Sequence, residues 1–451
     1  MVTIPRLSYI KKLQAWKDSP RRKPLILEGA RQVGKTWLMR DFATSHFKNA
    51  VYVRFDKDQQ LRAIFKRDFD VARIVHELEI AFKARVTDGE TVLLFDEIQA
   101  CKDAITALKY FCEDRPSLHV IAAGSLLGLE YRDDAAGAES GNDGEGTTGF
   151  PVGKVNALAV RPLTFVEFVR AVDSDALAAQ IEARDWGLLA DFRERLEDLL
   201  KHYFVIGGMP EAVATYLDTR NFIDVAQVHK EIISGYARDF AKHAPKKDVP
   251  RVAMAWASLP AQLARENKKF SYALIKRGER GANYREPLSW LQGAGLVHLC
   301  RRAKKPGIPL SAYADAAFKA YALDVGVLAA MSSLDSAVVL QGARVFTEFK
   351  GALTEQYVHQ QLIARDAGAP FYWSTDDSRT EVDFLVQEGM GVAPIEVKAA
   401  ENVKAKSLKS YIERFKPQKA YRYSLKGHQE DSIPLEGGGV CCLVNVPLYA
   451  I

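Results

Sequence analysis

Short apolar runs alternate with amphipathic stretches through the first 170 residues of the chain. The apolar runs predict strands at 25–29, 51–55, 91–96, 119–124 and 155–160. Helical patterns fill most of the gaps between them, which predicts a parallel sheet that is covered by helices on both faces. One gap differs, because residues 131–150 are rich in Gly, Asp and Glu and have few large apolar residues. We interpret it as a mobile loop.

The remainder of the chain follows two other patterns. Residues from about 171 to 330 have mostly helical periodicity, with one candidate strand at 296–300. After that come a helical stretch, two short strands and a second helix, which lie at 347–365, 381–386, 394–399 and 404–415. The sequence therefore predicts an α/β protein with three domains. These are a parallel-sheet domain at 1–170, a helical domain at 171–335 and a mixed α/β domain at 336–451.

Composition is that of an ordinary globular protein, with 48% hydrophobic and 26% charged residues. The net charge is only +5, so binding to nucleic acid would depend on a local patch and not on the whole surface. The five cysteines have neither a zinc spacing nor a disulfide framework, which favours a reducing compartment. The N-terminus lacks the apolar segment of a signal peptide, and no apolar run is long enough for a membrane span. We therefore expect a cytoplasmic protein.

The segment GARQVGKT, residues 29–36, fits the phosphate-loop pattern G-x-x-x-x-G-K-[ST]. It lies between an apolar strand and a helical pattern, where backbone N–H groups and a helix N-terminus can cradle phosphate. Lys35 is predicted to contact the β- and γ-phosphates of ATP and to be catalytic, and Thr36 to bind Mg²⁺. A turn that merely contains glycine is the alternative. The predicted nucleotide-binding residues are Gly29, Ala30, Arg31, Gln32, Val33, Gly34, Lys35, Thr36 and Asp96.

An acidic motif supports the nucleotide site. The strand at 91–96 ends on Asp96, whose carboxylate is predicted to help hold Mg²⁺ beside the phosphate loop. Glu97 is predicted to be catalytic by polarising the attacking water. This acidic pair, and the extra strand at 51–55, are typical of hydrolytic phosphate-loop proteins and not of nucleotide kinases. Ser125 is predicted to be a catalytic sensor of the γ-phosphate, and a serine that caps the next turn is the alternative.

Several motifs occur in an order that resembles one protein family. They are LEGARQVGKT (27–36), LLFDEIQ (93–99), IAAGSLL (121–127), FPVGKVNALAVRPLTFVEF (150–168), YFVIGGMPEAV (203–213) and FKAYALDVGVL (318–328). They are similar to those of bacterial and archaeal AAA-type P-loop ATPases that carry a C-terminal restriction-endonuclease-like (PD-(D/E)xK) domain. The resemblance covers nearly the whole chain. It implies an AAA-like ATP-binding domain, a helical or winged-helix middle domain and a nuclease-fold C-terminal domain.

The arginine that would complete an AAA site is not fixed by any motif. Arg161 and Arg238 are candidates, and a surface or salt-bridged arginine is the alternative at each position. Many AAA proteins complete their sites between subunits, so a homo-oligomer is compatible with the resemblance but does not follow from it.

The middle domain contains a strongly basic segment. Residues 265–305 hold eleven Lys or Arg against three Glu, a local net charge of +8. Helical spacing of Tyr284, Leu288 and Leu291, a Gly-Ala-Gly turn and a short strand suggest a winged helix. DNA is therefore a candidate partner of this segment and of the C-terminal domain, and a solvated packing face is the alternative. The predicted wing cations are Arg301, Arg302, Lys304 and Lys305.

The C-terminal strands carry residues that are similar to those of a metal-dependent nuclease site. On an antiparallel strand pair, Asp383, Glu396 and Lys398 would come together. Two carboxylates can hold Mg²⁺, and the lysine can act as a catalytic residue that orients water. Glu355, on the preceding helix, is similar to the further metal-shell glutamate of the family. The predicted metal ligands here are Glu355, Asp383 and Glu396, beside Thr36 and Asp96 at the ATP site.

Two alternatives for the C-terminal residues stay open at this point. Charged side chains also alternate along any half-exposed sheet edge, and an intact nuclease fold can bind or scaffold without cutting. The sequence therefore predicts a Mg²⁺-dependent ATP hydrolase in a nucleic-acid-directed or regulatory role, with a nuclease site at its C-terminal end. The alternative function is a nucleotide-gated DNA-binding or scaffold protein with slow turnover and an inactive nuclease fold.

Overall fold

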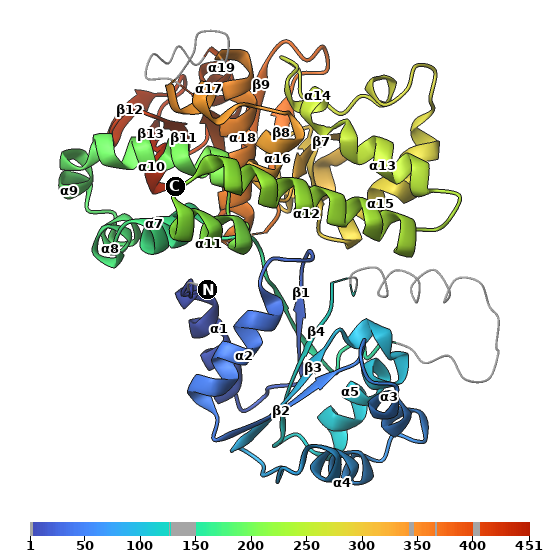
Figure 1. Ribbon diagram of the computed structural model, residues 1–451. Coiled ribbons are helices and arrows are strands. Elements are labelled where there is room, and N and C mark those ends of the chain that lie inside the picture. The colour runs from blue at the N-terminus through green and yellow to red at the C-terminus, as the bar shows by residue number, and fades with distance from the viewer. Residues whose placement is uncertain (1–2, 126, 128–149, 342–346, 366–367, 400–405) are drawn as a thin grey trace. The chain divides into compact units, whose positions relative to one another are not determined.

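The computed structural model describes residues 3–125, 127, 150–341, 347–365, 368–399 and 406–451 (Figure 1). The predicted mobile loop at 131–150 lies outside the described residues, apart from Phe150. The chain forms two compact units. One comprises Pro5–Arg161 and Gly293–Gly295, and the other comprises Met1–Ile4, Pro162–Gln292 and Leu296–Ile451.

The N-terminal unit contains the predicted parallel sheet. Its order is β2-β3-β4-β1-β5, and each neighbouring pair is parallel. Strand β4 therefore lies between β1 and β3. The phosphate loop follows β1, and the Asp-Glu pair lies at the carboxyl end of β3. Every predicted strand of this unit is confirmed: β1 (Leu25–Glu28), β2 (Asn49–Arg54), β3 (Thr91–Asp96), β4 (His119–Ala123) and β5 (Asn156–Ala159).

Helices cover both faces of this sheet (Figure 1). One face is covered by α1 (Leu7–Asp18) and α2 (Lys35–His46), and the other by α3 (Gln59–Lys66), α4 (Val71–Phe82) and α5 (Lys102–Asp114). Asp58 and Asp70 cap α3 and α4 by accepting hydrogen bonds from the first-turn N–H groups. A short 3₁₀ helix, Ile98–Ala100, follows β3.

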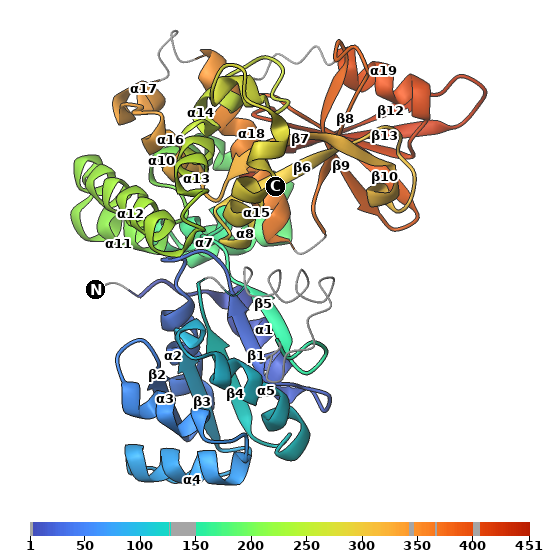
Figure 2. The ribbon, with the colours of Figure 1, turned by 90° about the vertical axis from the view of Figure 1, so that its right-hand side faces the viewer.

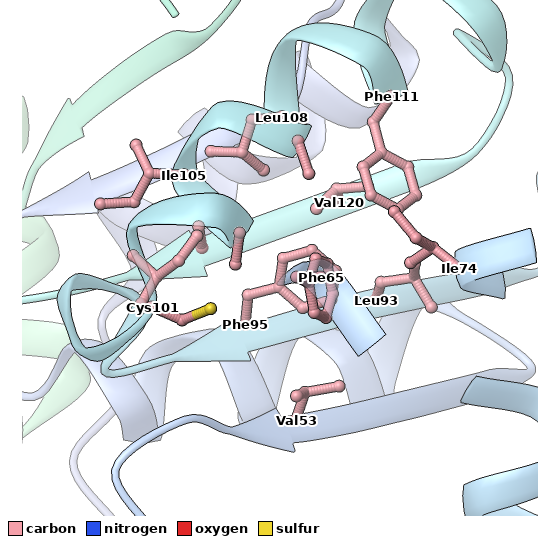
Figure 3. Close-up of a cluster of buried hydrophobic side chains, with 14 of the residues drawn as sticks. Val53, Phe65, Ile74, Leu93, Phe95, Cys101, Ile105, Leu108, Phe111 and Val120 are labelled. Carbon is pink, nitrogen blue, oxygen red and sulfur yellow. The ribbon is translucent and has the colours of Figure 1, made fainter. Parts of the chain in front are cut away.

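One hydrophobic core of the N-terminal unit lies between the sheet and α3–α5. Figure 3 shows part of it, formed by Val53, Phe65, Ile74, Leu93, Phe95, Cys101, Ile105, Leu108, Phe111 and Val120. Phe65 meets the edges of Phe55 and Phe95, with ring centroids 5.2 and 5.5 Å away, which is the geometry that aromatic pairs prefer. This packing holds β3 rigidly, and β3 carries the acidic motif at its end.

The C-terminal unit is built on a mixed eight-stranded sheet in the order β12-β13-β11-β10-β9-β8-β6-β7 (Figure 2). This sheet crosses the predicted boundary at residue 335, because β6 and β7 precede that boundary and β8–β13 follow it. Its strands are β6 (Val297–Ala303), β7 (Ala314–Ala322), β8 (Phe371–Ser374), β9 (Glu381–Glu388), β10 (Gly391–Val397), β11 (Lys419–Ser424), β12 (Gln429–Pro434) and β13 (Val440–Pro447).

Strand β7 was not predicted. Its sequence, ADAAFKAYA, has no β-branched residue and many alanines, which favour helix in isolation. Pairing with β6 overrides that preference, and β7 forms the edge of the sheet. The sequence predicted one strand between about 171 and 330, whereas the structure has two there, β6 and β7, so that prediction was wrong about β7.

Helices make up most of the rest of this unit. They are α7 (Phe165–Val172), α8 (Asp175–Ala183), α9 (Trp186–Asp191), α10 (Arg193–Ile206), α11 (Pro210–Thr219), α12 (Phe222–His243), α13 (Val249–Ala257), α14 (Leu259–Leu263), α15 (Arg285–Gly293), α16 (Val325–Met331), α17 (Ser336–Gln341), α18 (Thr347–Ala364) and α19 (Lys406–Phe415). Tyr284, Leu288 and Leu291 are buried, as their helical spacing predicted. None of the described helices combines the length and the apolar character that a bilayer crossing requires.

Candidate functional site

The backbone of the phosphate loop depends on glycine. The loop joins β1 to α2, and Gly29 and Gly34 have φ values of +133° and +93°. A Cβ atom on Gly29 would lie 2.2 Å from the carbonyl oxygen of Val160, just after β5. A side chain at position 29 would therefore clash with backbone as well as strain it. The loop that the motif predicted is thus built against the end of β5.

The ammonium group of Lys35 lies on the loop itself. Its Nζ donates hydrogen bonds to the carbonyl oxygens of Gly29 and Ala30, at 2.8 and 2.7 Å. Burial lowers the pKa of Lys35 to about 8, although the carboxylates of Glu97 and Asp96 oppose that shift. The Lys35 ammonium is therefore buried, and phosphate oxygens of a nucleotide can replace the two carbonyl oxygens as its hydrogen-bond acceptors.

Asp96 is the centre of a small polar network at the end of β3. Thr36 Oγ1 donates to its two carboxylate oxygens, at 3.2 and 3.0 Å, and Tyr52 OH donates to Oδ2 at 2.7 Å. The N–H of Glu97 also donates to Oδ1, at 3.1 Å. A hydroxyl oxygen and a carboxylate in contact are donors that suit a hard cation. Thr36 and Asp96, which the sequence predicted as Mg²⁺ ligands, therefore fit that ion.

Glu97 is held by a neighbour that the sequence did not point to. Gln99 Nε2 donates to Glu97 Oε2 at 2.5 Å. The other end of the Gln99 amide packs on Gly124, where an added Cβ would lie only 2.4 Å from Oε1. Gln99 thus links the end of β3 to the end of β4, and it contacts only Oε2 of the Glu97 carboxylate.

Ser125 follows β4, the strand that lies between those of the phosphate loop and Asp96. Its side chain is buried, and Oγ has no hydrogen-bond partner among the residues that the structure describes. A hydroxyl in this position has a free donor for a ligand oxygen. Its function as a γ-phosphate sensor stays a prediction.

Two further residues of this site belong to no sequence motif that could have predicted them. Tyr52 is placed beside Asp96 only by the pairing of β2 with β3. Arg6 is buried and donates to the carbonyl oxygens of Val33 and Arg161, at 3.4 and 2.8 Å, so it braces the loop from the N-terminal segment. Sequence spacing shows neither contact, because both join segments that are far apart in the chain.

The arginine that completes the site is not assigned by these contacts. Arg161 follows β5, and Tyr9 OH accepts a hydrogen bond from its backbone N–H at 3.0 Å. Arg238 belongs to α12 of the other unit. Both candidates stay predictions.

The lowered pKa of Lys35 predicts a pH dependence of ATP binding. In the free protein this amine loses its proton as the pH rises through about 8. Phosphate favours the ammonium form, so ATP binding takes up a proton above that pH. We expect nearly constant affinity below about pH 8 and a loss of up to about tenfold per pH unit above it. Titrations of ATP between about pH 7 and 9.5 measure this. The Lys35→Met variant should give a flat profile, and parallel profiles for both proteins would contradict the prediction.

The C-terminal unit brings the predicted carboxylates together. Strands β9 and β10 pair antiparallel, and the N–H of Val397 donates to Asp383 Oδ2 at 2.8 Å. Lys398 Nζ lies 2.6 Å from Glu396 Oε1. Glu355 lies on α18 and is fully buried in the same cluster. The predicted proximity of these residues thus agrees with the structure, whereas their metal-binding and catalytic roles stay predictions.

Four residues that were not predicted as site residues complete this cluster, namely Lys268, Lys319, Tyr321 and Glu381. Lys319, from β7, places Nζ 2.9 Å from Glu355 Oε1 and 2.6 Å from Glu381 Oε1. Lys268 forms an ion pair with Glu355 Oε2, and Tyr321 OH donates to Glu355 Oε1. A lysine within the apolar run AFKAYAL was the one signal in the sequence, because a buried lysine needs carboxylate partners.

The pKa shifts in the cluster follow from burial and charge. Burial and the carboxylates of Glu355 and Glu396 raise the pKa of Asp383 well above its ordinary value. Burial also disfavours the charged form of Glu355, yet Lys268 and Lys319 hold its pKa below the usual range. The surrounding carboxylates likewise outweigh burial at Lys319 and raise its pKa. Glu355 and Lys319 are therefore a charged pair at neutral pH.

The basic segment keeps most of its predicted wing cations exposed. Arg301, Lys304 and Lys305 are exposed, on β6 and in the turn that follows it. Arg302 differs, because its guanidinium is ion-paired with Asp315 and lies 3.4 Å from Asp376 Oδ1. Its side chain is 11% exposed, so three of the four cations face solvent while Arg302 serves the β6–β7 hairpin.

Comparison with known proteins identifies the N-terminal part. Residues 21–169 match a model described as an AAA domain. Residues 197–338 and 350–448 match two models described as domains of unknown function, DUF8612 and DUF4143. The N-terminal unit is therefore a P-loop AAA-like ATPase domain. Because the C-terminal match carries no described function, the restriction-endonuclease-like fold stays a prediction.

Solved structures give weaker likenesses, and the comparison with curated protein sequences gives no match. A Walker-type ATPase of Pyrococcus abyssi is 16% identical, with a TM-score of 0.45, and the match covers 73% of this chain and 96% of that one. The ORC1 protein of Aeropyrum pernix, in complex with DNA, is 14% identical, with a TM-score of 0.26 and coverages of 74% and 93%. At TM-scores below 0.5 these likenesses carry no weight for the function of this chain.

Proposed function

We propose that the N-terminal unit binds ATP together with Mg²⁺ and hydrolyses it at Lys35, Thr36, Asp96 and Glu97. The observation that carries the proposal is the direct contact of Thr36 Oγ1 with the Asp96 carboxylate, at 3.0 Å. It supports a magnesium site beside a glycine-dependent phosphate loop, with a second carboxylate on the next residue.

Each side chain then has a distinct task. Lys35 exchanges its two carbonyl partners for β- and γ-phosphate oxygens, and Ser125 donates to the γ-phosphate. Thr36 and Asp96 would hold Mg²⁺, which neutralises charge on the phosphates when it is bound. Glu97 orients the attacking water with Oε1, because Gln99 already occupies its Oε2.

Phosphate release from MgATP by the purified chain tests this proposal. Hydrolysis should need Glu97, and the rate should exceed that of Glu97→Gln in a matched preparation. Equal rates in the two proteins would refute hydrolysis at this site. Rates with and without DNA separate a nucleic-acid-coupled hydrolase from the slow, nucleotide-gated scaffold that is the alternative.

A contact with nucleic acid is favoured by one specific observation, the exposed cations of the β6–β7 hairpin. Arg301, Lys304 and Lys305 are predicted to contact phosphates of DNA. Three such contacts give a slope of about −3 in a plot of log affinity against log salt concentration. Fluorescence anisotropy with a labelled duplex measures this slope.

A triple variant tests whether these three cations contact DNA, and a surface lysine of the N-terminal unit provides the control. Replacing all three hairpin cations with alanine should reduce the slope by about 3 and weaken binding uniformly across sequences. Lys48→Ala removes an exposed cation of the N-terminal unit and should leave the slope unchanged. A slope near zero for the wild-type chain, or a slope that the triple variant keeps, would contradict this contact.

A further inference from the structure

An ammonium group fills the centre of the C-terminal carboxylate cluster. Lys319 Nζ lies 2.9 Å from Glu355 Oε1, 2.6 Å from Glu381 Oε1 and 3.9 Å from Asp383 Oδ1. The Lys319 side chain is 0% exposed, so water does not screen these contacts. The three carboxylates come from α18 and β9, and Lys319 comes from β7, the edge strand of the same sheet. The resemblance to a nuclease domain implies a divalent cation among these carboxylates, yet the ammonium group of Lys319 lies there.

The carboxylate oxygens around Lys319 are largely committed. Both oxygens of Glu355 are taken, Oε1 by Lys319 and Tyr321 and Oε2 by Lys268. Asp383 Oδ2 accepts the N–H of Val397 at 2.8 Å. Mg²⁺ requires near-octahedral oxygen ligands at short distances, so it would have to break several of these bonds.

Glu396 belongs to the same cluster and is paired as well. Lys398 Nζ lies 2.6 Å from its Oε1, whereas its Oε2 is buried without a hydrogen-bond partner among the described residues. Asp383 Oδ1 is likewise beyond hydrogen-bond distance of Lys319 Nζ, at 3.9 Å, and such oxygens do not by themselves complete the six-ligand shell of Mg²⁺. Within the part of the chain that the structure describes, no group of three or more His, Cys, Asp or Glu side chains is arranged to hold a metal ion.

Charge leads to the same result as geometry. Four carboxylates, of Glu355, Glu381, Asp383 and Glu396, face the three ammonium groups of Lys268, Lys319 and Lys398. A divalent cation among the same oxygens would lie a few ångströms from Lys319 Nζ, and like charges at such a distance repel strongly in a buried place. The residues present therefore do not fit a metal ion while Lys319 stays in the cluster.

We infer that the ammonium group of Lys319 takes the place of a metal ion in the C-terminal cluster, so that this cluster is a buried ion-pair network and not a Mg²⁺ site. The ion pairs connect β7 and the segment around Lys268 to α18 and β9. These parts lie on both sides of the predicted domain boundary at residue 335. The carboxylates thus hold the sheet edge in place, and metal-dependent cleavage would require Lys319 to leave.

Removing the ammonium tests the inference by stability and not by activity. Lys319→Met keeps the apolar stem but leaves buried carboxylates uncompensated. We expect the melting temperature of the C-terminal transition to fall by about 5–15 °C. Mn²⁺ or Mg²⁺ should then restore part of that loss in the variant, and should not raise the melting temperature of the wild-type chain without nucleotide. Lys409→Ala, which removes a 76% exposed ammonium of a surface ion pair on α19, is the matched control and should melt like the wild type.

A second measurement tests whether the C-terminal cluster binds a divalent metal ion, even if Lys319→Met does not fold. Mn²⁺ titrations of the wild-type chain and of Asp383→Asn, followed by electron paramagnetic resonance without nucleotide, should be superimposable. Asn keeps an oxygen that can accept the Val397 N–H, so this variant preserves the strand pair. Tight Mn²⁺ binding by the wild type that Asp383→Asn loses would overturn the inference. Unchanged stability of Lys319→Met would also overturn it.

Discussion

Replacing Lys35 with alanine is expected to weaken ATP binding by about 10- to 150-fold, which corresponds to the loss of about 1.5–3 kcal/mol for hydrogen bonds to a charged group. The reason is that Lys35 is the buried cation of the loop, with its Nζ within 2.8 Å of two carbonyl oxygens that phosphate would replace. Isothermal titration with ATP and Mg²⁺ measures the affinity directly.

The control for this variant lies in the same unit. Lys48→Ala removes an ammonium that pairs with Glu90 at the surface, and it should bind ATP like the wild type. The fold should survive Lys35→Ala because the substitution removes no large apolar contact from the core. Equal ATP affinity of Lys35→Ala and wild type, with both proteins folded, would show that ATP does not bind at the phosphate loop.

Replacing Glu97 with glutamine is expected to slow ATP turnover by about 10²–10⁴-fold while ATP affinity changes little. The amide can still accept the hydrogen bond from Gln99 if it turns its oxygen toward Nε2, so the end of β3 keeps its shape. It cannot take a proton from water, so the chemical step suffers and binding does not. Phosphate release under saturating ATP, beside a titration of ATP, separates the two effects.

Glu90→Gln is the matched control, because it removes an exposed carboxylate that lies just before β3. Its turnover should equal that of the wild type. If Glu97→Gln hydrolyses ATP at the wild-type rate, the water-orienting residue lies elsewhere. If it loses affinity instead of turnover, Glu97 supports nucleotide binding and the assignment of its role is wrong.

The nucleotide site could be predicted because its chemistry is local in sequence. Gly29 and Gly34 belong to one loop, and Lys35 and Thr36 begin the helix that follows it. The pattern of alternating strands and helices placed Asp96 at the same edge of the sheet. The structure adds what only the order of strands decides. Tyr52 reaches Asp96 only through the pairing of β2 with β3, which no spacing rule in the sequence singles out.

The C-terminal cluster shows the limit of sequence reasoning more sharply. The alternation along β9 and β10 was enough to group Asp383 with Glu396, because strand periodicity fixes the face of each residue. Lys319 could not be placed in that group, because it lies in an alanine-rich strand more than 60 residues away. A buried cation depends on a tertiary pairing, and the same carboxylates predict a metal site until that pairing is known.

The presence of Lys319 among the carboxylates bears on the choice between an active Mg²⁺-dependent nuclease and an inactive nuclease-like fold at the C-terminal end. Unpaired carboxylates would have favoured a Mg²⁺-dependent nuclease. Carboxylates that are ion-paired by Lys319, Lys268 and Lys398 favour a nuclease-like cluster that serves stability. The catalytic claim for this protein then rests on its N-terminal unit, and the exposed cations of the β6–β7 hairpin remain the candidate contact with nucleic acid.

The central claim is that the N-terminal unit hydrolyses ATP with Glu97 as the residue that orients water. The most direct measurement is phosphate release from MgATP by the wild-type chain and by Glu97→Gln, with ATP binding recorded on the same preparations. We predict saturable ATP binding by both proteins, and turnover that the variant loses by at least about 100-fold. Wild-type protein that binds ATP to saturation but releases phosphate no faster than Glu97→Gln would contradict the claim.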